Sequence, residues 1–161
     1  MWKNLAFLIA LLIASRFIGL PPNFTPMLAL AVFMPRLTGD KRIQYLLPVG
    51  IMAFSNLFLE PVNAIILATM LLVFAVTPTV SRHTKSLFWG STSAILIWHV
   101  TVNASQWFVH GGSLLDTYIA AVPFDFKLAV STGLYVAVFH YAENLYSVFT
   151  KANQKLLDRL I

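Results

Sequence analysis

Six apolar stretches, separated by prolines or by short charged segments, dominate this sequence and constrain its fold more than any other feature. A helix needs about 20 mostly apolar residues to cross a membrane. The stretches therefore predict an all-α integral membrane protein, a six-helix bundle that forms a single domain over residues 1–161. The expected spans are 4–20, 24–35, 43–59, 61–80, 87–108 and 126–149, followed by an amphipathic cytoplasmic tail at 150–161.

The composition excludes several other classes of protein. Hydrophobic residues make up 58% of the chain and charged residues only 11%, whereas soluble domains carry about 25% charged residues. So few charges do not cover the surface of a small soluble enzyme, and the hydrophobicity is too high for a disordered chain. Because the chain has no cysteine, it holds no disulfide, no cysteine-ligated zinc and no iron–sulfur cluster of its own.

The second stretch is expected to be short or broken, because Pro21, Pro22 and Pro26 precede it. Proline removes a backbone donor and restricts the residue before it. The apolar run Met27–Met34 is about 12 Å long as a helix. Either the proline-rich segment completes the crossing inside the membrane, or this piece is re-entrant. From 109 to 127 the sequence is less hydrophobic, and a long loop with a short helix is expected there.

The distribution of charge predicts the orientation. With six crossings, nine of the eleven Lys and Arg residues share one side, and Glu60, Asp116 and Asp125 collect on the other. The positive-inside rule then places both termini in the cytoplasm, in an inner membrane. This asymmetry explains the net charge of +5 without nucleic acid. An alternative is that the N-terminal stretch, which follows Lys3, is a signal peptide. The nine residues are Lys3, Arg36, Lys41, Arg42, Arg82, Lys85, Lys151, Lys155 and Arg159.

Two features of the first stretch predict interactions: a face of small residues that suits helix packing, and a charged residue inside the apolar stretch. Ala6, Ala10 and Ala14 recur every four residues and so share one helix face, which allows another helix to approach closely. That helix belongs either to a partner subunit or to this bundle. Arg16 either reaches outward to the interface, or pairs with a carboxylate such as Glu60, Asp116 or Asp125, or holds an anionic ligand.

The fifth stretch carries a polar and aromatic stripe. His99, Asn103 and Trp107 are four residues apart, and Gln106 and His110 flank them. The stripe offers hydrogen bonds and a stacking surface to a small ligand, or it bonds to neighbouring helices. Asn56 and Glu60 show the same spacing on the third stretch and could face the same outer half.

Haem or chlorophyll ligation by His99 or His140 is a weaker alternative, because the two histidines are expected at different depths. No Walker A, HExxH or GxSxG motif is present, and the chain is not expected to be an enzyme. An intramembrane enzyme would need two titratable groups within hydrogen-bond reach in a cavity. The sequence does not specify a cofactor.

Three blocks along the chain carry a resemblance to a known family. The first is Arg16, a short gap and Pro-Pro-Asn-Phe-Thr-Pro at 21–26, before an alanine-rich apolar run ending at Phe33. The second runs from Leu47-Pro48-Val49 to Ser55-Asn56, and the third is Tyr-Ile-Ala-Ala-Val-Pro-Phe at 118–124. Together they resemble a family of small uncharacterised bacterial membrane proteins.

That family is similar in fold to the substrate-binding S components of energy-coupling factor transporters, six-helix proteins that capture vitamins or metal ions. The resemblance implies a ligand site near the outer face, under the segments 21–26 and 109–126. It also implies that the face with Ala6, Ala10 and Ala14 docks to a transmembrane coupling subunit.

The predicted function is therefore the capture of a small molecule for a transporter. The alternative is a non-catalytic accessory or structural subunit of a larger respiratory or photosynthetic membrane complex. The expected partners are the lipid bilayer, an unidentified small molecule, and a coupling subunit or such a complex. The candidate ligand-binding residues are Arg16, Asn23, Asn56, His99, Asn103, Trp107 and Tyr118.

Overall fold

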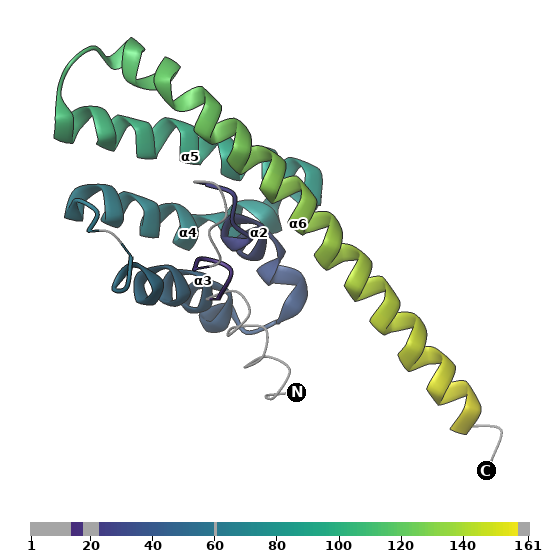
Figure 1. Ribbon diagram of the computed structural model, residues 1–161. Helices are drawn as coiled ribbons and strands as arrows, with labels where there is room; N and C mark the ends of the chain where they lie inside the picture. The colour runs from purple at the N-terminus through teal and green to yellow at the C-terminus, as the bar shows by residue number, and fades with distance from the viewer. Residues whose placement is uncertain (1–13, 18–22, 60, 158–161) are drawn as a thin grey trace.

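The computed structural model describes residues 14–17, 23–59 and 61–157, with side chains up to residue 147. Over these residues the protein is all-helical, as expected, and Figure 1 shows the arrangement of its helices. Most of the first predicted stretch, including Ala6 and Ala10, lies outside the described residues, as do Glu60 and the last residues of the tail. The helices are α2 (Met27–Leu37), α3 (Lys41–Asn56), α4 (Ala64–Thr84), α5 (Leu87–His110) and α6 (Leu114–Leu157).

Local signals explain where three of the helices begin. The side chain of Asp40 accepts a hydrogen bond of 2.8 Å from the backbone of Arg42, and Asn63 caps α4 in the same way at 2.9 Å. Ser86 caps α5 through a longer contact to the backbone of Trp89. Such caps satisfy amide groups that have no partner inside the helix. The apolar stretches at 43–59, 61–80 and 87–108 therefore form α3, α4 and α5 close to the expected bounds.

The expected long loop over 109–127 is wrong, because helix α6 already begins at Leu114. The turn between α5 and α6 is confined to Gly111, Gly112 and Ser113, and both glycines have positive φ, at 74° and 87°. Glycine adopts such angles without steric cost. The helix then continues through Pro123, although proline removes one backbone hydrogen bond.

Helix α2 lies at the centre of the bundle and packs against α3, α4, α5 and α6. All eight residues from Met27 to Met34 are buried, each at most 1% exposed. A helix that is apolar all round belongs in an interior, and its alanines let the surrounding helices approach closely. One polar contact anchors it, because the Ser81 hydroxyl donates to the Val32 carbonyl at 2.6 Å.

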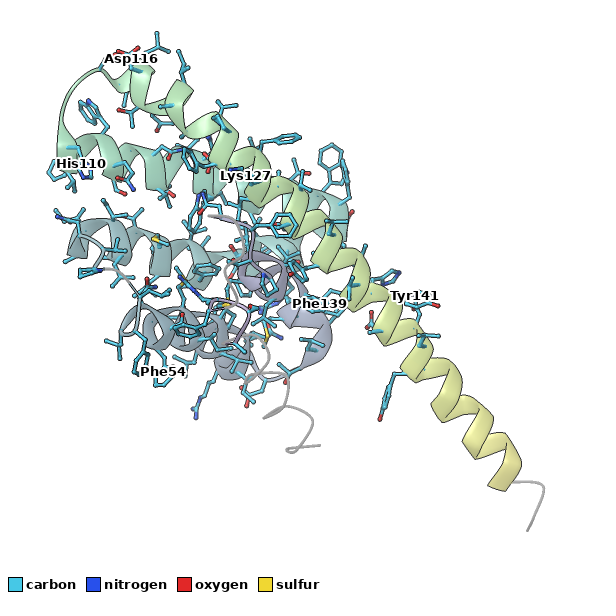
Figure 2. The ribbon with its side chains drawn as sticks, viewed as in Figure 1. Phe54, His110, Asp116, Lys127, Phe139 and Tyr141 are labelled. Atoms are coloured by element: carbon cyan, nitrogen blue, oxygen red, sulfur yellow. The ribbon has the colours of Figure 1, made fainter. Side chains whose placement is uncertain are left out.

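The outer helices are arranged around this centre. In Figure 1, α3, α4 and α5 lie side by side, and α6 slants along α5, contacts α2, and continues well beyond the other helices. Figure 2 shows Phe139 on the side of α6 that faces the bundle, where its ring packs 5.8 Å from that of Phe33. Tyr141, two residues later, points away and is 66% exposed.

The exterior of the bundle is strongly apolar. Large hydrophobic side chains that are more than half exposed occur on all four outer helices, an arrangement that water-soluble monomers avoid over wide areas. Within the described residues, α4 and residues 114–147 of α6 are long and apolar enough to cross a membrane. The exposed side chains include Leu46, Leu57, Phe58, Leu72, Phe88, Trp89, Leu96, Phe108, Leu115, Phe126, Leu134 and Val138.

Replacing Gly90 by alanine is expected to destabilise the protein by about 1–3 kcal/mol. A Cβ atom at Gly90 would lie 3.1 Å from the Ser81 hydroxyl oxygen and 3.2 Å from Ser81 Cα. Neither atom yields easily, because one is hydrogen-bonded to Val32 and the other is backbone. Thermal unfolding in detergent, followed by circular dichroism, measures the change.

Gly133→Ala is the matched control. Gly133 also lies inside a helix, but nothing is within 4 Å of a Cβ atom placed there. Alanine is the better helix former, so this variant should be as stable as the wild type or more stable. A loss at Gly133 as large as that at Gly90 would contradict close packing of α4 against α5.

Candidate functional site

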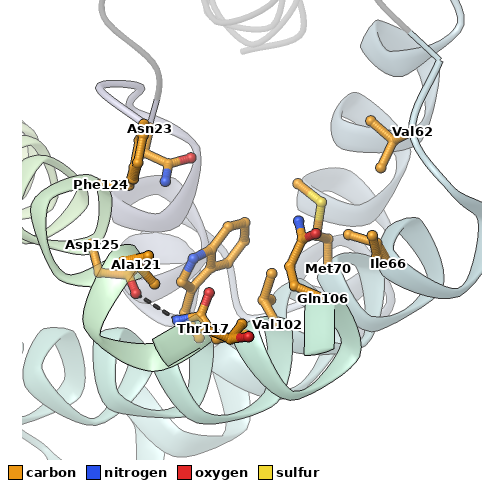
Figure 3. A pocket seen from close by; sticks show the side chains of 13 residues that line it. Asn23, Val62, Ile66, Met70, Val102, Gln106, Thr117, Ala121, Phe124 and Asp125 are labelled. Carbon is orange, nitrogen blue, oxygen red and sulfur yellow. Dashed lines mark hydrogen bonds between the residues drawn. The ribbon is translucent and has the colours of Figure 1, made fainter. Parts of the chain in front are cut away.

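A cavity of about 440 Å³ lies between α4, α5, α6 and the segment that precedes α2. Figure 3 shows its lining side chains. The volume lies within the range of roughly 300–1,000 Å³ typical of small-molecule pockets. The lining is mostly apolar, with a few polar groups. The thirteen lining residues are Asn23, Val62, Ile66, Met70, Trp98, Val102, Asn103, Gln106, Thr117, Ala120, Ala121, Phe124 and Asp125.

Asp125 provides the charged group of this cavity. It lies on α6 and is 7% exposed. The Asn103 amide nitrogen donates to its Oδ2 atom at 2.7 Å (dashed in Figure 3), and His99 Nδ1 lies 2.7 Å from the same oxygen. Two acceptors do not attract each other, so Nδ1 carries the hydrogen when Asp125 is a carboxylate. Buried charges need such donors, and here both come from α5.

Tyr118 holds His99 in place. Its hydroxyl donates to the Val100 carbonyl at 2.6 Å, and its ring meets the His99 ring edge-on with centroids 5.3 Å apart. The Asn103 amide nitrogen also lies 3.2 Å from His99 Nδ1. The interface of α5 and α6 therefore brings together three of the predicted site residues: His99 and Asn103, one turn apart on α5, and Tyr118 on α6.

Asn23 completes one side of the cavity from a distant part of the sequence. Its φ angle is +64°, in the left-handed region that asparagine tolerates better than most residues. The Ser131 hydroxyl lies 3.3 Å from its carbonyl oxygen and 3.4 Å from that of Thr25. These contacts hold the segment before α2 against α6.

Arg16 lines a smaller neighbouring cavity of about 80 Å³. This cavity shares Asn23, Met70 and Trp98 with the larger one. The guanidinium contacts the sulfur of Met52. Pairing with Asp116 or Asp125 is not observed, because the ion pairs among the described residues involve neither of these with Arg16. Glu60 lies outside the described residues.

Two other predicted residues lie away from the cavity wall. The Trp107 indole donates to the Gly112 carbonyl at 3.0 Å and is directed at the α5–α6 turn. Asn56 donates to the Met52 carbonyl at 2.8 Å, within its own helix. Neither residue is part of the lining. Ala14, from the predicted docking face, is exposed, and Ala6 and Ala10 cannot be compared with it.

His140 lies far along α6, close to Asn144 and Glu143. It is exposed and takes no part in the cavity. No group of three or more His, Asp or Glu residues that could hold a metal ion occurs in the described ranges.

Several lining residues were not among the predicted site residues: Met70, Trp98, Thr117, Phe124 and Asp125. On α5 the cavity uses 98, 102, 103 and 106, a face rotated slightly from the predicted stripe at 99, 103 and 107. Gln106 was placed beside that stripe and does line the cavity. The sequence predicts Asp125 on the outer side, as one possible partner for Arg16. A carboxylate within an apolar helix would have been the signal.

The fold and the cavity define a small helical-bundle protein with an apolar exterior and a partly polar pocket between its helices. Residues 1–154 match the model of a family of unknown function, DUF6580, and the chain belongs to that family. The expectation of an uncharacterised family is therefore confirmed. No curated protein and no solved structure matches the chain.

Proposed function

We propose that this protein spans the membrane several times and captures a small molecule in the cavity between α4, α5 and α6. The observation that carries the proposal is the cavity itself, about 440 Å³ in volume, with amide, hydroxyl and carboxylate groups among apolar and aromatic walls. Ligand sites of membrane bundles commonly use polar groups of this kind, because such groups are costly at membrane depth without a role.

The membrane location rests on two further features. The exposed side chains of α3–α6 are largely apolar, and two helices have the length and hydropathy of membrane spans. The positive-inside rule applied to the loops 36–42 and 81–85 favours cytoplasmic termini. In this orientation the α5–α6 turn and the nearby cavity lie toward the outer face.

The mode of action follows the resemblance to S components. Ligand would bind from outside, the segment 21–26 would cover it against the wall formed by the first turns of α6, and a coupling subunit that docks on Ala6, Ala10 and Ala14 would drive its release. In this scheme Arg16, Asn23, His99, Asn103 and Tyr118 bind the ligand or hold its site. The protein itself is non-catalytic.

Replacing Ala121 by phenylalanine is expected to abolish ligand capture, because the larger side chain would occupy the cavity that Ala121 lines. The full chain is purified in a mild detergent, and mass spectrometry identifies small molecules that co-purify. Ala137→Phe is the control, because Ala137 lies on the same helix, is exposed, and is not part of the lining. Wild type and the control should carry the same small molecule, and Ala121→Phe should lack it.

A second candidate is an accessory subunit of a larger membrane complex. The part of α6 that continues beyond the bundle favours this candidate, because Tyr141 and Leu145 are exposed there. The same purification separates the two functions. Recovery in fixed proportion with a respiratory or photosynthetic assembly, with no bound small molecule, would replace capture by the accessory role.

A further inference from the structure

We propose that the cavity takes a protonated amine with an apolar or aromatic body, an inference that rests on the proposed capture function. The reason is the charge of the wall. Of the thirteen described residues that line the cavity, Asp125 alone carries a formal charge. A ligand with one positive charge therefore neutralises the site, whereas an anion would face an uncompensated carboxylate in an environment of low polarity.

The carboxylate of Asp125 has one oxygen committed and one available. Asn103 and His99 both contact Oδ2, at 2.7 Å each. No described residue donates a hydrogen bond to Oδ1. When Asp125 is a carboxylate, His99 donates from Nδ1 and Asn103 donates from its amide, and both bonds go to Oδ2. The two donors fix the orientation of the carboxylate, and its second oxygen accepts the ligand ammonium.

No cation of the protein occupies this position. Arg16 faces the smaller cavity and contacts Met52, and Lys127 places its ammonium 5.5 Å from the centre of the Phe124 ring. Among the described residues, His99 is the only basic side chain within 4 Å of the Asp125 carboxylate, and it carries a charge only when both of its ring nitrogens are protonated. The Lys127 ammonium lies over the ring of Phe124, a lining residue, at a distance at which cation–π attraction operates.

The remaining wall favours an organic cation over a metal ion. Trp98, Met70 and Val102 are apolar or aromatic neighbours, and Trp98 is the lining ring best suited to stack against an amine. Hard metal ions instead need six or more oxygen ligands or bound water. One carboxylate with three side-chain amides and one hydroxyl does not provide such a shell.

The test uses three probes that each carry a two-carbon chain on a phenyl ring but differ in charge. They are phenethylamine (positive), 2-phenylethanol (neutral) and phenylacetate (negative). Binding to the purified full chain in detergent is measured by isothermal titration calorimetry. Phenethylamine should bind at least about ten-fold more tightly than either other probe. Asp125→Asn should weaken phenethylamine binding by about ten- to hundred-fold, the range expected for a hydrogen bond to a charged group.

Asp116→Asn is the matched control for Asp125→Asn. Asp116 is an exposed carboxylate on the same helix and is not part of the lining. This variant should bind phenethylamine as the wild type does. If Asp125→Asn does not fold, the comparison of the three probes on the wild-type chain decides alone.

The other outcomes are distinct. Binding of 2-phenylethanol or phenylacetate as tight as that of phenethylamine would overturn the amine assignment and leave capture in place. Equal binding of phenethylamine to wild type and Asp125→Asn would overturn the role of Asp125. If none of the probes binds and no small molecule co-purifies with the wild type, both the amine assignment and the capture function are overturned.

Discussion

Replacing Phe33 by alanine is expected to lower the free energy of unfolding by about 3 kcal/mol, the lower end of the range for deleting a buried aromatic side chain. Phe33 is 1% exposed and is among the largest fully buried side chains of the bundle. Its ring packs against Phe139 of α6. Moving an apolar side chain from lipid into the interior of a membrane protein contributes little to stability. The loss of stability in this variant therefore comes mainly from the cavity left between α2 and α6.

Phe108→Ala is the control for this variant. Phe108 is 69% exposed on α5, so its removal leaves no internal cavity. Unfolding of both variants by a denaturing detergent titrated into mixed micelles, followed by circular dichroism, gives the comparison. The Phe108 variant should stay within about 0.5 kcal/mol of wild type, as surface substitutions usually do. Equal losses at the two positions would mean that α2 is not the packed centre of the bundle.

Replacing Asn103 by leucine is expected to cost about 2 kcal/mol of stability, because a hydrogen bond to a charged group contributes roughly 1.5–3 kcal/mol. The change removes the 2.7 Å donor to Asp125 and leaves a buried carboxylate held by His99 alone. The same change made together with Asp125→Asn should cost less, since no buried charge is then left short of a donor. The expected coupling energy is about 1 kcal/mol or more.

The chain offers an internal control for this double-mutant cycle of Asn103→Leu and Asp125→Asn. Asn144 stands four residues after His140, as Asn103 does after His99, and contacts it at 3.3 Å. Asn144 is exposed, so Asn144→Leu should have little effect on stability. Additive effects of Asn103→Leu and Asp125→Asn would show that these two side chains do not act as one unit.

Much of the fold could be predicted from the sequence, because helix α3, α4 and α5 each combine an apolar stretch with a capping residue before it. The beginning of α6 could not. The glycines at 111 and 112, Pro123 and Asp125 are individually typical of a loop, and only the glycines end a helix here. Packing against α5 outweighs the cost of Pro123, and a single-sequence pattern does not report packing of that kind.

The candidate site could be predicted only in part, because a sequence pattern does not report how helices pack against each other. His99, Asn103 and Tyr118 were selected as polar groups in or near an apolar helix, and the structure brings them together. Their shared partner, Asp125, depends on how α5 and α6 cross, and helix periodicity alone does not determine a crossing. The crossing of α5 and α6 also explains why the face of α5 that lines the cavity is rotated slightly from the predicted stripe.

The continuity of α6 has a mechanical consequence. From Asp125 at the cavity to Leu157, the helix runs about 48 Å at 1.5 Å per residue. Up to Phe139 the helix remains packed on the bundle, and the arm beyond Phe139 is about 27 Å long. Figure 1 shows that this distal part of α6 extends past the other helices. Because one continuous helix forms both a wall of the cavity and this distal arm, a tilt of that wall would also displace residues 140–157.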